Sequence, residues 1–401
     1  MIHLETPSKF RALVEQAHQV AAEIFRPNSR RYDRAEHEYP KELDMLGALL
    51  DGMNASGVGG AGAAGVRRES AHGEGNRNGT NLSTALGTME LCWGDVGFLL
   101  SMPRQGLGNA AIASVASEEQ LQRFAGRWAA MAITEPHCGS DSAAIRTTAR
   151  LDGDHYVLNG DKIFVTAGAR AELVVVWATL DRSAGRAAIK SFVVEKGTPG
   201  FELVRLEHKL GIRASDTAQF ALRDCRVPAA NLLGDPAINV EKGFAGVMQT
   251  FDNTRPLVAA MAVGLARACI EETQRLLKAV GVEIDYDRPA HAQPAAAAEL
   301  LRLEADYEAA RLLTLQAAWM ADNRKPNSLQ ASQAKAKAGR ACVDIALKCV
   351  ELCGSAGYGE GELLEKWARD AKILDIFEGT QQIQLLIIAR RLLGKTSAEL
   401  K

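Results

Sequence analysis

The sequence is poor in aromatic residues and has no paired cysteines. Phe, Trp and Tyr make up 5% of its 401 residues, and its seven cysteines are scattered without a CxxC pair. An odd number of dispersed cysteines argues against a disulfide framework, so we expect reduced thiols and a cytoplasmic location. The eight histidines form neither an HExxH motif nor a helical pair at ligand spacing, so we expect no metal site.

An excess of charge of one sign and long apolar runs are also missing. The formal net charge is −2, from 47 Lys and Arg against 49 Asp and Glu, and the two signs are mixed along the chain. Without a basic patch, the sequence does not predict binding to nucleic acid. No apolar stretch reaches the roughly 20 residues of a membrane-spanning helix, and the first residues lack the apolar core of a signal peptide.

One glycine pattern typical of dinucleotide binding lacks its usual setting. Gly57, Gly59 and Gly62 fit GxGxxG. Such a motif binds a pyrophosphate when it joins a strand to a helix inside a βαβ unit. Here a helical pattern precedes the glycines and no β-branched run does. We therefore interpret 57–81 as a loop and not as a Rossmann motif.

Hydrophobic periodicity divides the chain into three domains, predicted at 1–126, 127–235 and 236–401. In the first, helices are expected over 10–25, ended by Pro27, and over 40–50, 80–93 and 106–115. In the second, short β-rich runs separated by glycines occur at 171–180, 188–195, 201–206 and 219–223. In the third, long helices are expected over 244–280, 295–322, 329–353, 362–376 and 380–393.

These patterns predict an α+β fold that is mostly α. We expect an N-terminal helical domain, a middle antiparallel β-barrel or sandwich, and a C-terminal up-and-down helical bundle. The middle domain is expected to be antiparallel because no helix-length pattern lies between its strands.

Glu378 stands at the break between the last two predicted helices. Gly379 would end the first helix and allow close approach of a ligand, and Thr380 can cap the next one. The apolar neighbours Ile376 and Phe377 would raise the pKa of the Glu378 carboxyl towards that of a useful general base. Taken alone, the stretch could also be an ordinary helix end with an exposed carboxylate.

A second polar stretch, residues 132–141, opens the β region. It reads Ala-Ile-Thr-Glu-Pro-His-Cys-Gly-Ser-Asp, a strand that runs into a loop of hydroxyls, glycine and backbone amides. Such a loop can hydrogen-bond a polar heterocycle and orient it. A tight turn without a ligand is the alternative for this segment alone.

Together these stretches resemble the acyl-CoA dehydrogenases, flavoenzymes that desaturate acyl thioesters. Residues 132–144 are similar to the first signature of that family, and residues 351–358 to the second. Further similar segments follow in the family's order over roughly residues 40 to 395, at 162–166, 215–217, 226–228, 252–256 and 371–373. Agreement at so many spaced positions is far more specific than one short motif.

The resemblance implies FAD as cofactor, an acyl-CoA as substrate and an electron-transfer flavoprotein as electron acceptor in fatty acid metabolism. Glu378 would remove the α-proton while the β-hydride passes to FAD, which gives the 2-enoyl-CoA. Some relatives carry the base at the position of Thr254, which cannot act as one here. The resemblance implies cofactor binding by Met131, Ile133, Thr134, Ser140, Phe164, Thr166, Gly354, Thr380 and Gln382, and substrate binding by Ser140, Asp252, Arg255 and Gly379.

The chain departs from the family where a neighbouring subunit usually reaches FAD. An Arg-Lys-Thr-Phe-Gly stretch of the family falls on residues 283–287, Glu-Ile-Asp-Tyr-Asp, and a nearby glutamine falls on Pro294. Acidic groups repel the pyrophosphate that a cation would bind. Either the register shifts by a few residues and Arg288 substitutes, or a related chain supplies the missing contacts.

Three functions remain open from the sequence. The first is an acyl-CoA dehydrogenase that forms a homodimer or homotetramer. The second is a subunit of a heteromeric acyl-CoA dehydrogenase, with incomplete FAD contacts of its own. The third is a flavin oxidase or monooxygenase on the same fold. Acyl length and branching, fatty or steroid-derived, also remain open.

Overall fold

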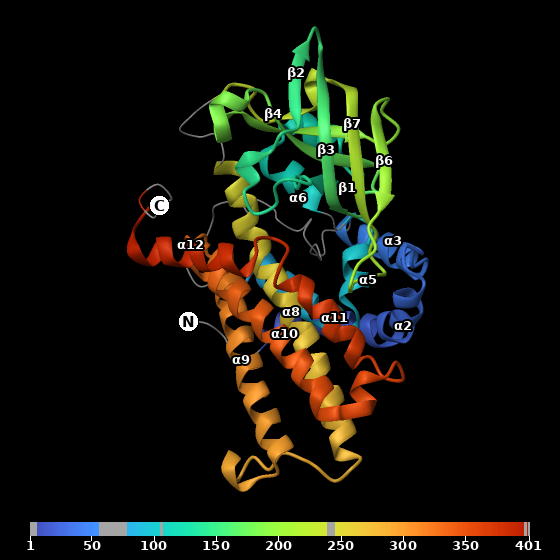
Figure 1. Ribbon diagram of the computed structural model, residues 1–401, viewed down its shortest axis with the longest axis vertical. Coiled ribbons are helices and arrows are strands. Elements are labelled where there is room, and N and C mark those ends of the chain that lie inside the picture. The colour runs from blue at the N-terminus through green and yellow to red at the C-terminus, as the bar shows by residue number, and fades with distance from the viewer. Residues whose placement is uncertain (1–5, 56–77, 105–106, 239–244, 397–398, 400–401) are drawn as a thin grey trace.

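The computed structural model of the protein describes residues 6–55, 78–104, 107–238, 245–396 and 399, without the side chains of 49–55 and 245–253. Figure 1 shows a β domain stacked on one end of a helical bundle, with the N-terminal helices beside both. The glycine motif at 57–62 lies outside the described residues, as does most of the loop predicted at 57–81.

Short helices build the N-terminal part of the chain. The predicted helices at 80–93 and 106–115 are present as α4 and α6, and the one at 40–50 as α3. The periodicity did not predict α2, α5 and α7, of which α5 and α7 are only six residues long each. The helices are α1 (Arg11–Val20), α2 (Arg26–Arg34), α3 (Glu42–Ala55), α4 (Thr80–Gly94), α5 (Val96–Ser101), α6 (Leu107–Val115) and α7 (Glu118–Arg123), with η1 (Ser8–Phe10) and η2 (Ala21–Phe25).

The prediction that Pro27 ends the first helix is wrong. The chain passes from α1 through η2, a π-helical turn, directly into α2, with Pro27 in the first turn of α2. Proline lacks the N–H that a helix interior needs, but the first turn of a helix does not require this donor. The wider π turn therefore lets the helix continue through the proline. Asn28 adds support, because its Nδ2 donates to the Ile24 carbonyl at 2.9 Å.

The β domain is one eight-stranded sheet. Its strand order is β6-β7-β3-β2-β4-β5-β8, and β1 pairs with β4. The pairing is antiparallel as predicted, except that β1 and β2 lie parallel to β4. The strands are β1 (Ala129–Ala132), β2 (Thr148–Asp152), β3 (His155–Thr166), β4 (Leu173–Thr179), β5 (Ile189–Glu195), β6 (Phe201–Leu206), β7 (Thr217–Pro228) and β8 (Leu232–Leu233).

The sheet curls around its own core. One cluster of buried side chains joins Leu158 of β3, Val176 of β4, Phe192 of β5 and Phe220 of β7. Side chains from distant positions in the strand order meet only when the sheet closes on itself, which is the barrel-like arrangement that the sequence predicts. The strand β3 was missed because the polar run 159–162 has low β-propensity.

The C-terminal bundle packs its long helices against the N-terminal ones. It contains α8 (Ala245–Lys278), α9 (Ala295–Asp322), α10 (Ser328–Tyr358), α11 (Leu364–Leu374) and α12 (Gln381–Leu393). A single apolar core runs from the N-terminal helices into the bundle. Gly264 allows α8 to approach α4, since a Cβ there would lie 2.1 Å from the Met89 carbonyl oxygen. The prediction of an all-helical bundle after the β domain is confirmed.

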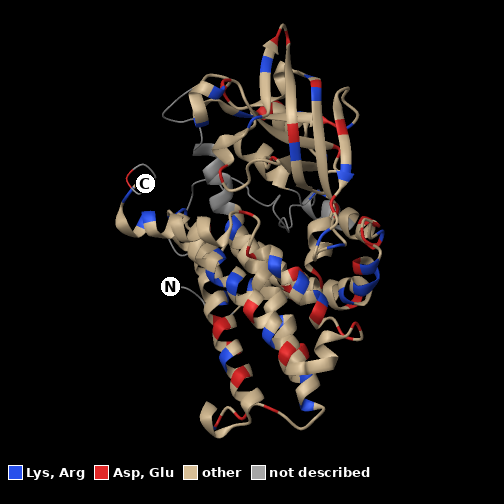
Figure 2. Cartoon of the chain, in the orientation of Figure 1, with Lys and Arg blue, Asp and Glu red and all other residues tan. Residues whose placement is uncertain are grey.

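Lys and Arg residues are interspersed with Asp and Glu residues along the described chain. Figure 2 shows this mixture on the helices of the bundle and on the strands of the sheet. Among the described helices, none combines the length and the apolar character that a membrane crossing requires.

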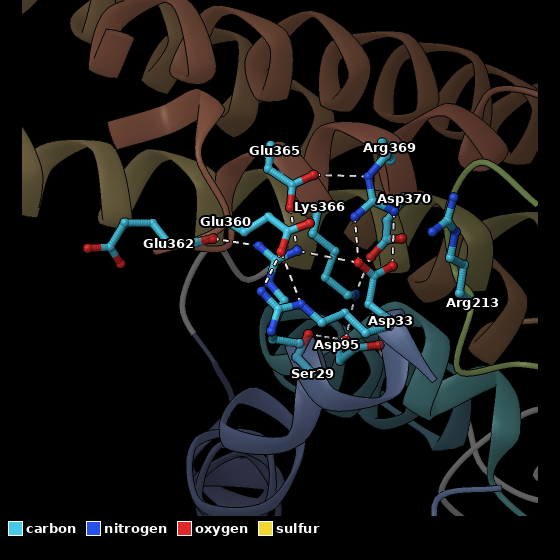
Figure 3. Close-up of polar contacts among 12 residues, drawn as sticks. Ser29, Asp33, Asp95, Arg213, Glu360, Glu362, Glu365, Lys366, Arg369 and Asp370 are labelled. Atoms are coloured by element: carbon cyan, nitrogen blue, oxygen red, sulfur yellow. Dashed lines mark hydrogen bonds and ion pairs between the residues drawn. The ribbon is translucent and has the colours of Figure 1, made fainter. Parts of the chain in front are cut away.

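Buried charges anchor α11, the helix that leads into Glu378. The Lys366 ammonium is fully buried between the carboxylates of Asp95, at 2.7 Å, and Asp370, at 2.5 Å. Asp370 also accepts a hydrogen bond from the Ile212 N–H at 2.5 Å, in the β domain. Ser29 of α2 donates to Asp95. Figure 3 shows these side chains converging from helices of both helical parts of the chain.

A second ion cluster lies beside the first on α11. The Arg369 guanidinium pairs with Asp33 of α2 at 2.5 Å and donates to the Leu210 carbonyl at 3.0 Å. Arg369 also contacts Glu365 at 3.0 Å. The position of α11 is thus fixed against both the N-terminal helices and the β domain, and this fixes the start of the turn that carries Glu378.

Candidate active site

The turn between α11 and α12 has a left-handed backbone at two consecutive residues. Glu378 has φ +57° and Gly379 has φ +94°. A glutamate rarely adopts a positive φ, and such conformations persist only where the surroundings hold them. Thr380 is the N-cap of α12, as predicted, and its hydroxyl accepts from the Ile383 N–H at 3.4 Å. Figure 1 shows this turn at the end of the bundle that faces the β domain.

Two buried side chains, one from α12 and one from α10, donate hydrogen bonds to the carbonyl groups of this turn. Gln384 of α12 donates from Nε2 to the carbonyls of both Glu378 and Gly379, at 3.1 Å each. Lys335 of α10 donates from Nζ to the Gly379 carbonyl at 2.7 Å. A Cβ at position 379 would lie 2.4 Å from Gln384 Nε2, and φ there is +94°, so a side chain would displace the Gln384 amide and strain the backbone.

The Glu378 carboxylate points towards α8. The Thr254 hydroxyl donates to its Oε2 at 2.8 Å. Burial raises the pKa of the Glu378 carboxyl above its ordinary value, although the Thr254 hydrogen bond and the Arg255 and Lys335 cations lower it. Desolvation therefore outweighs the opposing charges, and the result is a carboxylate that binds a proton more readily than one in water.

Of the predicted substrate-binding residues, the structure brings Arg255 and Gly379 next to Glu378. Arg255 is 3% exposed, and its charge acts on Glu378. Asp252 lies on the same helix, α8, but its side chain is outside the described ones. Whether Asp252 and Arg255 contact a substrate stays a prediction.

A buried ion pair supports the predicted flavin loop after β1. Lys162 of β3 contacts Glu135 at 2.8 Å, with both side chains almost fully buried. The Lys162 ammonium also donates to the Ile133 carbonyl at 3.1 Å. Because a trans peptide directs its C=O and N–H to opposite sides, the Thr134 N–H points away from Lys162. That N–H belongs to a residue predicted to hold a flavin ring.

Phe164 is presented on the surface of the β domain by a bulge in β3. The pairing of β3 with β7 shifts register between Lys162 and Val165. Phe164 has φ +58° and a side chain that is 59% exposed. A bulge re-aims a side chain, and a positive φ is rare for a bulky residue, so the surrounding strands hold this ring on the surface. The exposed ring and the Thr134 amide together fit the flat polar ring of FAD.

The remaining predicted residues divide between two ends of the molecule. Met131 and Thr166 are partly exposed at the ends of β1 and β3, while Ser140 and Gln382 are exposed on the loop after β1 and on α12. Gly354 lies near the other end of α10, 19 residues and about 28 Å beyond Lys335. This chain therefore does not bring Gly354 to Glu378.

Reasoning from the sequence assigned no role to Lys335, Gln384 or the Glu135–Lys162 pair. A signal for Lys335 was present, since it falls on the same helical stripe as Ala331, Ala338 and Cys342. A lysine on an apolar stripe indicates a buried charge that needs a partner. Gln384 carries no comparable signal, because a polar residue near a helix start is ordinary.

The fold and the site define a flavin-dependent oxidoreductase in which two helical domains flank a β domain in the sequence. The chain belongs to the acyl-CoA dehydrogenase family. It matches the acyl-CoA dehydrogenase N-terminal domain over residues 7–132, the middle domain over 130–225 and the C-terminal domain over 241–393. The predicted family, its three-part architecture and its FAD cofactor are confirmed.

Three related proteins illustrate the similarity. A short-chain-specific acyl-CoA dehydrogenase of Clostridium acetobutylicum is 36% identical over 282 residues, which cover 69% of this chain and 73% of the relative. The mitochondrial short-chain-specific acyl-CoA dehydrogenase of Rattus norvegicus is 40% identical over 269 residues, 65% of this chain and 62% of the relative. The butyryl-CoA dehydrogenase structure from Megasphaera elsdenii superposes with a TM-score of 0.83 at 29% identity, covering 98% of this chain and 100% of that one.

Proposed function

We propose that this chain dehydrogenates an acyl-CoA thioester to the 2-enoyl-CoA, with Glu378 as the base that removes the α-proton. The observation that carries the proposal is the Glu378 carboxylate on its left-handed turn, held by Thr254 and raised in pKa by burial. A base is most effective when its pKa lies near the working pH, and desolvation moves a carboxyl in that direction.

The backbone of the same turn can also stabilise the negative charge that develops on the substrate during proton removal. Removing an α-proton develops negative charge on the thioester oxygen, which hydrogen-bond donors must stabilise. Gln384 and Lys335 occupy the carbonyls of Glu378 and Gly379. The N–H groups of Gly379 and Thr380, on the opposite edges of those peptides, therefore point away from these side chains. We assign the enolate contact to the backbone of this turn: the geometry offers the N–H groups of Gly379 and Thr380, and the resemblance to the family adds the Glu378 N–H.

Residues of the β domain and of α12 would hold the cofactor. Thr134 and Ile133 would bind the flavin ring by hydrogen bonds, Phe164 would stack on it, and Met131 and Thr166 would line it. Ser140 would reach its phosphate side, and Thr380 and Gln382 would help to hold the cofactor. When bound, FAD accepts the β-hydride that leaves as the α-proton moves to Glu378.

We further propose a short straight-chain acyl-CoA as the substrate and an electron-transfer flavoprotein as the electron acceptor. Support for a short chain comes from the relatives described above, two of them short-chain specific and one a butyryl-CoA dehydrogenase. Arg255 and Asp252 of α8 would contact the CoA part. A cytoplasmic location also stays a proposal, supported by seven free cysteines, six of them buried.

The experiment is anaerobic titration of the FAD-loaded protein with a panel of acyl-CoAs, followed by flavin absorbance. We expect bleaching by acyl-CoAs, with butyryl-CoA faster than long-chain, branched or steroid-derived members. No bleaching by any member would contradict the proposed activity. Bleaching followed by fast reoxidation in air would instead identify an oxidase or monooxygenase.

A second candidate, a subunit of a heteromeric acyl-CoA dehydrogenase, is favoured by the loop between α8 and α9. Figure 1 shows this loop at the end of the bundle far from the β domain. Glu283 pairs there with Lys278 at 3.2 Å, and Arg288 pairs with Asp285 at 3.2 Å. Arg288 is thus engaged with a carboxylate of its own loop, and the surroundings are acidic where the family places a cation.

Sedimentation monitored at the protein and flavin bands tests this candidate. We expect at least a dimer, because the residues predicted to contact FAD lie at opposite ends of the helical bundle, too far apart to bind one cofactor within a single chain. A homo-oligomer with one FAD per chain supports the homomeric enzyme. A colourless homo-oligomer that takes up FAD only with a co-expressed related chain supports the heteromer, and a monomer with full FAD would exclude both arrangements.

A further inference from the structure

We propose that Lys335 is a positioning residue for the catalytic carboxylate. Its buried ammonium, together with the Gln384 amide, holds the Gly379 carbonyl and so keeps Glu378 in the left-handed turn from which it faces the substrate. The inference rests on the proposed role of Glu378 as the base.

The geometry of the turn requires such a support. Glu378 and Gly379 both have positive φ, and the chain has no helical hydrogen-bond ladder between α11 and α12 to impose it. Lys335 and Gln384 are both fully buried, and their donors meet at the Gly379 carbonyl at 2.7 and 3.1 Å. They come from two different helices, α10 and α12, so the carbonyl is fixed from two directions.

A neutral donor could make the same hydrogen bond, so the charge of Lys335 needs a separate explanation. The charged groups that face it are Asp375 at the end of α11, Glu378 in the turn and Arg255 on α8. Asp375 already has two other cations, Arg340 at 3.4 Å and Lys372 at 3.2 Å. Pairing with Asp375 alone therefore does not account for a lysine here.

The charge acts on the base itself. Burial lowers the pKa of Lys335 to about 8, against the opposing effect of Asp375 and Glu378, so the ammonium form predominates at neutral pH. In that form it lowers the pKa of the Glu378 carboxyl, which burial raises. Lys335 thus favours the ionised form of Glu378, while burial keeps its pKa above that of an ordinary carboxyl.

The experiment compares three variants of the full-length, FAD-loaded protein with the parent. Lys335→Met removes the charge and the donor, Lys335→Gln keeps a neutral donor, and Lys337→Met is the matched control. Lys337 lies two residues further along α10 and pairs with Asp306 of α9, away from the turn. The rate of anaerobic flavin reduction by butyryl-CoA is measured from pH 5.5 to pH 8 for each protein, and each profile is scaled to its own plateau.

For Lys335→Met we expect a lower maximal rate of flavin reduction. We also expect the rise of this rate with pH, the acid limb of the profile, to occur at higher pH than in the parent. Without the cation the Glu378 carboxyl holds its proton up to a higher pH, so the scaled rate at the lowest pH falls by about tenfold, which corresponds to a one-unit displacement. Lys335→Gln is expected to recover part of the plateau and to keep the displaced limb. Lys337→Met is expected to reproduce the parent profile.

The proposal is overturned if the scaled pH profile of Lys335→Met or Lys335→Gln matches that of the parent. It is also overturned if the acid limb of Lys337→Met is displaced to the same extent. Scaling removes the influence of partial unfolding, because inactive protein lowers a whole profile without moving its limb. Glu378→Gln separates the two levels of inference. If the flavin of Glu378→Gln is reduced at the parent rate, the assignment of Glu378 as the base fails. If Glu378→Gln is inactive but the scaled pH profiles of the Lys335 variants match the parent, only the role of Lys335 is rejected.

Discussion

Replacing Glu378 by glutamine should leave FAD content unchanged and slow flavin reduction by butyryl-CoA by at least ~10²–10⁴-fold. Glutamine keeps the size of the side chain and an oxygen that can accept from the Thr254 hydroxyl, now 2.8 Å from the carboxylate. It has no basic group for the α-proton. The reduction rate in anaerobic stopped flow, with flavin absorbance as the signal, measures the effect.

The loss should not come from unfolding. Because burial raises the pKa of Glu378, the folded state holds its proton up to a higher pH than the unfolded state does. The stability that this carboxyl contributes is therefore present at low pH and is lost as the pH rises through its raised pKa. At neutral pH the glutamine variant should be at least as stable as the parent. The control is Glu360→Gln, which changes an exposed carboxylate paired with Arg34.

The pH dependence of the parent follows from the same shift. Glu378 must be ionised to accept a proton, so the reduction rate should rise with pH through a pKa above the ordinary value of a carboxyl. This rise should be absent from the residual rate of Glu378→Gln. Equal rates for the variant and the parent would remove Glu378 from its proposed role.

The second large effect is expected on stability, from Lys366→Met. The change leaves the carboxylates of Asp95 and Asp370 buried without the ammonium that now lies 2.7 and 2.5 Å away. Removing one partner of a buried ion pair typically costs about 3–5 kcal/mol of unfolding free energy. Urea unfolding of the variant and the parent measures the difference.

A matched control and a pH test separate this mechanism from the loss of any lysine. Lys348→Met removes a lysine that pairs with the exposed Glu351 on the surface of α10, and should cost less than about 1 kcal/mol. Burial raises the pKa of Asp370, and Lys366 opposes that rise. Without Lys366 the folded state binds a proton more tightly than the unfolded chain, so the deficit of Lys366→Met should shrink as the pH falls. A variant as stable as the parent at neutral pH would contradict the anchoring role of the cluster.

Several parts of the site could be predicted from the sequence because they depend on local chemistry. Gly379 and Thr380 signal a helix break followed by a helix start, and both are found in those roles. The apolar surroundings of Glu378 predicted the direction of its pKa shift. The flavin-binding role of the loop after β1 was predicted from its run of hydroxyls and glycine, and it stays a prediction. In each case the determining residues are neighbours in the chain.

Other parts could not be predicted because they join residues far apart in sequence. The contact of Lys335 with Gly379 spans 44 residues, and that of Thr254 with Glu378 spans 124. The continuation of the first helix through Pro27 depends on a π turn, which no propensity indicates. The separation of Gly354 from Glu378 depends on the length of α10, which carries Gly354 to the opposite end of the bundle.

The sequence by itself determined the order of helices and strands, the residue types available for acid–base chemistry and the break in the chain where Glu378 stands. These features depend on periodicity, capping and backbone preference, which act over a few residues. Only the tertiary structure decided that this carboxylate turns inward to Thr254, and that its turn is held by one buried cation and one buried amide. Burial and electrostatic coupling depend on which helices pack together, and that is a property of the whole fold.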